Sequence, residues 1–278
     1  MSCWLGPRID VRDSYPPLLA EFTRTLTSFA AAEWELPTVC PGWSVKDVTA
    51  HVVGDHVSRL SRHRDGYSAG GPAGDETLAG FIDRVNAEWV IAARRMSPRV
   101  LTSWFTAVAD EIVALWQAAD LDAVGEPVSW AGPEPAPAWL DAARDFTEIW
   151  THYQQICDAV GRPGAAEYAV IVLDTFMRAL PHTLRPFAAP PGTTVVVVVP
   201  GAGSWACGRD PDRWRLAAGG ADVAPAARIE LDADTAWRLC TRGLLPSQAI
   251  PRARIYGDRT LAEAALQIVS IIWAHATR

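Results

Sequence analysis

The sequence predicts an α+β chain of two domains, a helical bundle in residues 1–186 followed by a smaller α+β domain in residues 192–278. Three observations predict this division. Apolar residues recur at helical spacing through most of the first region. Residues 188–192 form a linker of alanine, proline and glycine, and residues 193–199 after it are mostly β-branched, as in a strand.

The helical pattern of the first region has clear start and stop signals. Ser44 is a natural N-cap, and Asp47 three residues later forms an acidic version of the capping box. Gly161 and Pro163 end a strong helix in the usual C-terminal order. Residues 125–137 are a proline-rich connector, and residues 201–205 are interpreted as a turn between strands. The predicted helices cover residues 15–32, 44–64, 76–95, 99–119, 138–160 and 166–184, and the second region has predicted strands at 193–199, 213–217 and 227–231 and helices at 235–241 and 258–273.

Composition excludes several classes of protein. A net charge of −7 argues against a nucleic-acid partner, which needs a basic surface. The N-terminal residues lack the apolar stretch of a signal peptide, and the longest apolar run, at residues 195–199, is too short to cross a bilayer, so we expect a cytoplasmic protein without a membrane partner. The five cysteines are scattered without CxxC spacing, which indicates neither a disulfide framework nor a thiolate zinc site.

Candidate metal ligands are therefore histidines and carboxylates. Glu148 and His152 are four residues apart in a predicted helix, so their side chains leave the same face one turn apart. His51 lies in the middle of another predicted helix, where a lone histidine is more often a core residue. Bundles assemble metal sites from inward side chains on different helices, so the three residues together predict one site. Two imidazoles and one carboxylate suit zinc with an open position, and with two open positions they suit ferrous iron.

Three stretches of the chain carry a resemblance to a known family. They are residues 36–51, with a Pro-Gly-Trp turn, a capped helix and His51; residues 148–163, with Glu148, His152 and an Ala-x-Gly ending; and residues 255–262, with a Gly-Asp-x-x-Leu-Ala segment. In these the chain resembles the mycothiol-dependent maleylpyruvate isomerase family of the DinB-like metalloenzyme superfamily. The resemblance implies a DinB-like four-helix bundle and a sterol-carrier-like C-terminal domain. It also implies an enzyme with zinc, or another divalent metal, at His51, Glu148 and His152.

The resemblance also implies mycothiol, a thiol of actinobacteria, as cosubstrate. Zinc would lower the pKa of the thiol, and the thiolate would attack an electrophilic carbon of a second small substrate. Relatives have an aspartate where this chain has Gln155. Because glutamine is not a carboxylate base, we expect an orienting or proton-transfer role to be lost there, and we favour a thiol S-transferase over the isomerase itself.

Other residues are weaker candidates. Arg242 and Arg259 could bind carboxylate groups of the thiol or substrate, although a solvated surface is the simpler explanation for any single arginine. Asp55 and His56 could orient a metal ligand or could be ordinary polar residues of a helix.

Two rival functions remain open at this point. One is a ferrous-iron enzyme of sulfur oxidation from the same superfamily. The other is a non-catalytic sensor of zinc or thiol, which predicts a closed site with a fourth protein ligand such as His56. The expected partners are a small thiol and a small electrophile, and the chain is expected to be a monomer or a homodimer.

Overall fold

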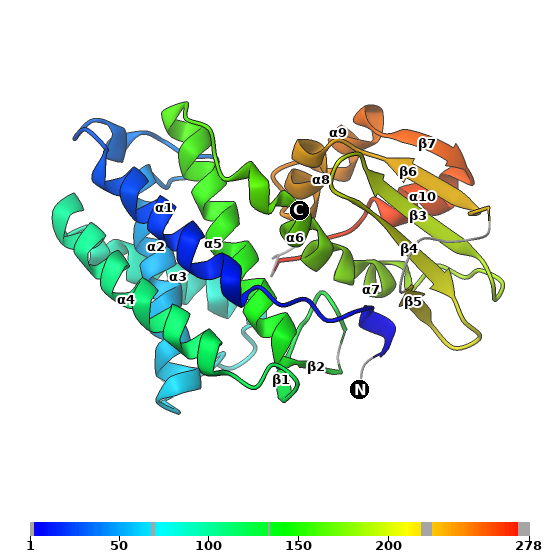
Figure 1. Ribbon diagram of the computed structural model, residues 1–278, viewed down its shortest axis with the longest axis horizontal. Coiled ribbons are helices and arrows are strands. Elements are labelled where there is room, and N and C mark those ends of the chain that lie inside the picture. Colours follow the sequence, from blue (N-terminus) through cyan, green and yellow to red (C-terminus); the bar gives the residue numbers. More distant parts are fainter. Residues whose placement is uncertain (1–2, 68–69, 133, 218–223, 272–278) are drawn as a thin grey trace. The chain divides into compact units, whose positions relative to one another are not determined.

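The computed structural model describes residues 3–67, 70–132, 134–217 and 224–271, and its contacts divide the chain into two compact units. The helical unit comprises Val11–Asp120 and Asp145–Ala166. The sheet unit comprises the described residues of 1–10, Leu121–Arg144 and 167–273. Both helical and strand structure are present, so the predicted α+β class is confirmed (Figure 1). The units follow spatial contacts and alternate along the chain, whereas the predicted boundary at residues 186–192 is a single cut in the sequence, and it stays a prediction.

Long helices build the helical unit. Their bounds are α1, Tyr15–Thr27; α2, Val45–Arg59; α3, Leu78–Ala93; α4, Pro98–Ala118; and α5, Ala138–Val160, which enters this unit at Asp145. A π-helical turn, Leu60–Arg64, continues α2 to the predicted end at residue 64. Helix α5 has the predicted bounds, and α1 ends at Thr27 rather than near residue 32.

Helices α1, α2, α4 and α5 form the bundle, and aromatic side chains fill its core. Phe22 of α1 is fully buried between Phe105 of α4 and Tyr153 of α5, with ring centroids 4.6 and 4.8 Å apart. Burying such large apolar side chains is the main stabilising contribution in a bundle of this kind. The predicted four-helix arrangement is therefore present (Figure 1).

Helix α3 lies against α2 outside this core. The Trp89 indole of α3 donates a 2.7 Å hydrogen bond to the Ala50 carbonyl oxygen of α2. Gly54 makes this approach possible, because a Cβ at that position would lie 2.5 Å from the Trp89 ring. Glycine fits between the two helices here because it has no Cβ.

A five-stranded sheet organises the other unit. Its strands are β3, Thr194–Val199; β4, Gly203–Arg209; β5, Trp214–Leu216; β6, Ala227–Glu230; and β7, Arg254–Gly257, in the order β5-β4-β3-β6-β7. Strand β3 pairs parallel with β6, and the other pairs are antiparallel. In the middle of the sheet Val197 lies opposite Trp205 on one side and Ile229 on the other. Val197 and Ile229 are buried, as expected of central strands.

Shorter elements complete the sheet unit. They are the hairpin of β1, Val124–Pro127, and β2, Pro135–Pro137, and the helices α6, Ala169–Phe176; α7, Leu180–Leu184; α8, Ala233–Cys240; α9, Pro246–Ala249; and α10, Arg259–Ala265. Helices α6, α7 and α10 contact the strands of the sheet. No helix of the described residues combines the length and apolar character that crossing a bilayer requires.

Several predictions of local structure in this unit were wrong. Strands β4 and β7 and the β1–β2 hairpin were not predicted, and the supposed turn at residues 201–205 is already strand from Gly203. Strand β4 is rich in glycine and alanine, so the β-branched signal is missing, and its pairing with β3 supplies the structure instead. Helix α10 ends at Ala265, because beyond it Ser270 donates hydrogen bonds to the carbonyl oxygens of Cys240 and Phe176. Residues 272 and 273 of that predicted helix lie outside the described residues.

Candidate metal centre

The start of α2 determines where His51 lies. Ser44 accepts a hydrogen bond from the Asp47 amide and the Asp47 carboxylate accepts one from the Ser44 amide, so the predicted capping box is confirmed. The Arg94 guanidinium donates a 2.9 Å hydrogen bond to the same carboxylate. Burial alone would raise the pKa of Asp47, but the bonds from Arg94 and Ser44 outweigh it and lower that pKa below its ordinary value. With this end of α2 fixed, His51 falls on the buried side of the helix, 5% exposed.

The packing of α5 orients Glu148 and His152. The indole of Trp150 is buried and donates a 2.7 Å hydrogen bond to the Ala165 carbonyl oxygen. Tyr153 is buried against α1 and its hydroxyl bonds Thr25 at 3.0 Å. These two anchors set the rotation of α5 about its axis. His152 is then nearly buried, and the Glu148 side chain stays 41% exposed, so solvent reaches the pair from one side.

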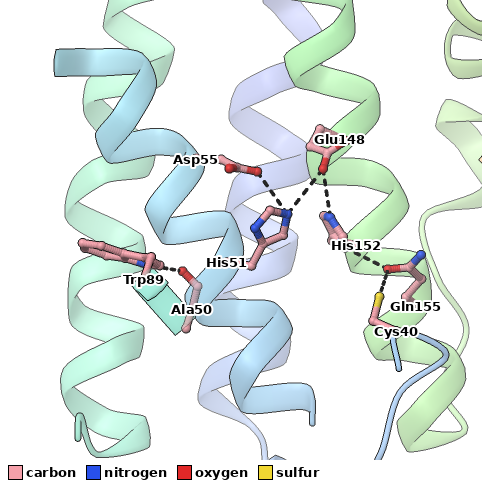
Figure 2. A network of polar contacts seen from close by, with 8 residues as sticks. All are labelled: Cys40, Ala50, His51, Asp55, Trp89, Glu148, His152 and Gln155. Carbon is pink, nitrogen blue, oxygen red and sulfur yellow. Dashed lines mark hydrogen bonds and ion pairs between the residues drawn. The ribbon is translucent and has the colours of Figure 1, made fainter. Parts of the chain in front are cut away.

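The three predicted residues converge in the structure. Figure 2 shows both imidazoles directed at one oxygen of Glu148. Oε1 of Glu148 is 3.5 Å from Nε2 of His51 and 3.0 Å from Nε2 of His152. One possible ligand atom from each residue lies within 4.8 Å of the others, a spacing that a single metal ion could occupy. Two imidazole nitrogens and a carboxylate oxygen are a donor set that fits a divalent metal.

Gln155 corrects one inference from the sequence. Its Oε1 lies 2.8 Å from Nδ1 of His152 and accepts a 3.2 Å hydrogen bond from the Cys40 thiol (Figure 2). An amide oxygen can only accept, so Nδ1 of His152 carries a proton. Burial lowers the pKa of His152, but the Glu148 carboxylate, 3.0 Å from Nε2, outweighs burial and raises that pKa well above its ordinary value. Nε2 therefore also carries a proton and donates it to Glu148, and a metal ion would take the place of that second proton. The expected loss of an orienting role at Gln155 was therefore wrong, because an amide orients an imidazole without being charged. Its spacing of three residues from His152 was the signal in the sequence.

Asp55 and His56, the two neighbouring candidates on α2, have different surroundings. Oδ2 of Asp55 lies 3.2 Å from Nε2 of His51, on the side that faces Glu148 (Figure 2). His56 is buried, its ring centroid is 6.0 Å from that of Phe105, and neither ring nitrogen has a hydrogen-bond partner among the described residues. His56 is also not part of the convergent group, so it does not supply the fourth protein ligand that a closed sensor site would need.

The electrostatics of the group follow from its burial and its charges. Burial raises the pKa of the Asp55 carboxyl to about 6, with the Glu148 charge adding to this and the His51 charge opposing it. Burial alone would raise the pKa of Glu148, but the His152 and His51 side chains lower it well below its ordinary value. Burial and, to a smaller extent, the His51 charge together lower the pKa of His56 to about 3, so His56 is neutral near pH 7.

The two arginines predicted to bind the thiol lie in the sheet unit. The Arg242 guanidinium donates to the backbone oxygens of Ile268 and Gln267 at 2.8 and 2.7 Å. Arg259 pairs with Glu263 one turn later at 2.8 Å and is 68% exposed. These contacts give Arg242 a structural role and leave the Arg259 guanidinium accessible, and thiol binding by either residue stays a prediction.

Fold and site together define a class, that of helical-bundle proteins in which two histidines and one glutamate converge in an arrangement that fits a divalent metal. Comparison with known families places the chain within it. The sequence model described as the mycothiol maleylpyruvate isomerase N-terminal domain matches residues 15–157, more than half of the 278 residues. The chain therefore belongs to the mycothiol maleylpyruvate isomerase family, and the predictions of this family and of an enzyme are confirmed.

One solved structure agrees on the fold. A crystal structure of the mycothiol-dependent maleylpyruvate isomerase is 13% identical, with a TM-score of 0.50, and the match covers 82% of this chain and 86% of that one. A crystal structure of a mutant of that isomerase covers the same shares, with 14% identity and a TM-score of 0.49. At such identities the first match supports the fold alone. None of the curated proteins compared with the chain matches it.

Proposed function

We propose that the chain is a zinc-dependent enzyme that activates mycothiol, or a similar small thiol, for reaction with a small electrophilic substrate. The observation that carries this proposal is the convergence of His51, Glu148 and His152 on one point that solvent can reach. A bound zinc ion would supply a lowered thiol pKa, and so a thiolate near neutral pH. Family membership supports mycothiol as the thiol. A small thiol cosubstrate favours the cytoplasm as the compartment, since thiols are kept reduced there.

The chain's own side chains prepare the site for this chemistry. Gln155 holds a proton of His152 on Nδ1, so that Nε2, which points at the centre, is the nitrogen that would bind a metal once its own proton is displaced. Asp55 adds a carboxylate oxygen beside His51, where it can accept a hydrogen bond from a bound molecule. The exposed side of Glu148 leaves a path for the thiol to enter.

We favour transfer of the thiol over isomerisation. In a transfer, the thiolate sulfur forms a bond to the electrophilic carbon and the leaving group departs with the electron pair of the bond that breaks. In the alternative, a maleylpyruvate-type isomerisation, the carbon–sulfur bond forms as the π bond of a conjugated carbon–carbon double bond breaks and its electron pair moves onto the conjugated carbonyl. The substrate then rotates about the resulting single bond, and the carbon–sulfur bond breaks as the double bond re-forms and the thiolate is released. Gln155 supports the first course, because a neutral amide can orient His152 but cannot accept a proton as a carboxylate does.

Removal of one ligand tests the metal and the chemistry together. His152→Ala should lose retained metal and thiol-dependent turnover, whereas His63→Ala, at an exposed histidine of the π-helical turn, should keep both. Metal analysis of protein purified without added metal separates zinc from ferrous iron. A product whose mass contains the thiol supports transfer, and an isomeric product with free thiol supports the alternative. Full turnover by metal-free His152→Ala would refute the proposal.

A further inference from the structure

The sheet unit contains a cavity that is separate from the metal centre. It has a volume of about 160 Å³ and is lined by the N-terminal turn Cys3–Leu5, the loop around Gly132, helix α7, the end of β4 and strand β5. All of these belong to the same compact unit, and the turn and α7 both contact β5 (Figure 1). One water molecule needs roughly 10–15 Å³ of such space, so the cavity accommodates a small organic molecule.

Two tryptophans form the apolar part of the wall. Trp4 and Trp214 are 6% and 3% exposed. Trp4 packs over the backbone of Gly132, where a Cβ would lie 3.1 Å from the indole. The fully buried Arg178 side chain donates to the carbonyl oxygen of Leu5 and so ties the N-terminal turn in place. The aromatic wall is thus held rigidly, as an apolar binding surface requires.

The Trp4 indole also has an unused donor. Its Nε1 is buried and has no hydrogen-bond partner among the described residues. Trp214, in comparison, donates a 3.3 Å hydrogen bond to the Phe187 carbonyl oxygen. The Nε1 atom is shielded from solvent and so does not face the cavity, and Trp4 contributes only apolar ring surface to the wall.

The charged part of the wall has an excess of positive charge. Arg185 and Arg209 both line the cavity, and their hydrogen bonds go to the backbone oxygens of His182 and Asp210. Within the described residues neither guanidinium has a carboxylate partner. A guanidinium has five donor hydrogens and binds a carboxylate in a forked geometry, so both have donors to offer.

The remaining ionisable groups determine the net charge of the cavity wall, and so the charge of the ligand that it would bind. Arg213 is neutralised by Glu134, whose carboxylate is 3.1 Å away. Asp212 adds one negative charge at the wall. Burial lowers the pKa of His182 below its ordinary value and the Arg185 charge lowers it further, so His182 is neutral at pH 7. Three arginines and two carboxylates leave one positive charge in excess, which matches a monoanion.

We propose that this cavity binds a small organic acid, with its single carboxylate at Arg185 and Arg209 and its apolar body against Trp4 and Trp214. The site lies in a different unit from His51, Glu148 and His152, and the proposal does not depend on the function proposed for that centre. A flat apolar acid suits the two indole walls, whereas a hydrated inorganic anion would leave them uncovered.

Calorimetric titration of the full chain tests this proposal. The three ligands are benzoate, its neutral analogue benzamide, and inorganic phosphate. Benzoate should bind saturably at one site, and at least tenfold more tightly than either of the other two. Arg185→Gln, at an exposed position, should weaken benzoate binding at least tenfold without affecting folding. Trp4→Phe, which keeps an aromatic ring but reduces the apolar area of the wall, should weaken it about threefold to tenfold.

Two control variants separate this site from other sources of binding. Arg84→Gln removes an exposed arginine of the helical unit that pairs with Glu76, and it should leave benzoate binding unchanged. His152→Ala should also leave benzoate binding unchanged, because the proposed site contains no residue of the metal centre. The proposal would be overturned if benzoate did not bind saturably, or if benzamide bound equally well or phosphate more tightly. It would also be overturned if Arg185→Gln bound benzoate fully or if His152→Ala lost benzoate binding.

Discussion

Substitution of Gln155 by leucine should weaken metal binding at the candidate centre. In the native chain the Gln155 oxygen accepts from Nδ1 of His152 at 2.8 Å, which leaves Nε2 as the nitrogen that would bind a metal. His152 is 8% exposed, so water does not readily replace the lost acceptor. In Gln155→Leu the Nδ1 proton has no acceptor and is readily lost, whereas the Nε2 proton stays bonded to Glu148, whose oxygen is 3.0 Å away. Metal binding must then reverse this change and leave a buried Nδ1–H without a partner.

The magnitude follows from that unpaired donor. A buried N–H without an acceptor costs about 1 to 3 kcal/mol. Applied to the metal-bound form alone, this is roughly a 10- to 100-fold loss of zinc affinity, a range also typical for residues that support metal ligands. Competition with a chromophoric zinc chelator measures the affinity on the full-length protein.

Two further variants make this reasoning specific. Gln155→Glu keeps an acceptor at His152 and should bind zinc at least as tightly as the native chain. Cys40→Ala removes the other partner of the same amide oxygen and should change the affinity by no more than about threefold, because the bond to His152 remains. Native zinc affinity in a folded Gln155→Leu variant would refute the tautomer argument.

The remaining predictions concern stability and one arginine. The folded-state pKa of Asp47 is depressed, so its contribution is present above the unfolded pKa of about 4 and is lost as pH falls through the lower folded pKa. Asp47→Asn should therefore lower the free energy of unfolding by about 1 kcal/mol at neutral pH, with a smaller difference in urea titrations below pH 4; an equal difference at both would contradict this. Gly54→Ala should displace α3, since its Cβ would lie 2.5 Å from the Trp89 ring, and should cost about 1 to 3 kcal/mol in thermal unfolding; an unchanged midpoint would show that the helices separate freely. Arg259→Ala removes an exposed ion pair and should change stability by less than about 0.5 kcal/mol, so a raised KM for the thiol would report its predicted role and an unchanged KM would end it.

Local signals in the sequence were sufficient for much of the helical unit. Helix α5 has its predicted bounds, and the capping box of Ser44 and Asp47 forms as expected. Both depend on residues close together in the chain, which interact in the same way in most surroundings. The spacing of Glu148 and His152 was similarly sufficient to place them on one face of a helix. Strands β4 and β7 were missed, because β4 has no β-branched residue and β7 has only one, and pairing with distant neighbours stabilises both.

By itself the sequence determined most of the helices, the ends that carry capping signals and the residue types that could bind a metal, because short-range hydrogen bonds and apolar periodicity decide these. Only the tertiary structure decided that His51 meets Glu148, from a residue 97 positions away in the chain, at 3.5 Å. It likewise decided that His56, five residues after His51, lies in the core and not at the site. The direction of a side chain depends on the rotation of its helix, and that rotation is set by packing against other helices.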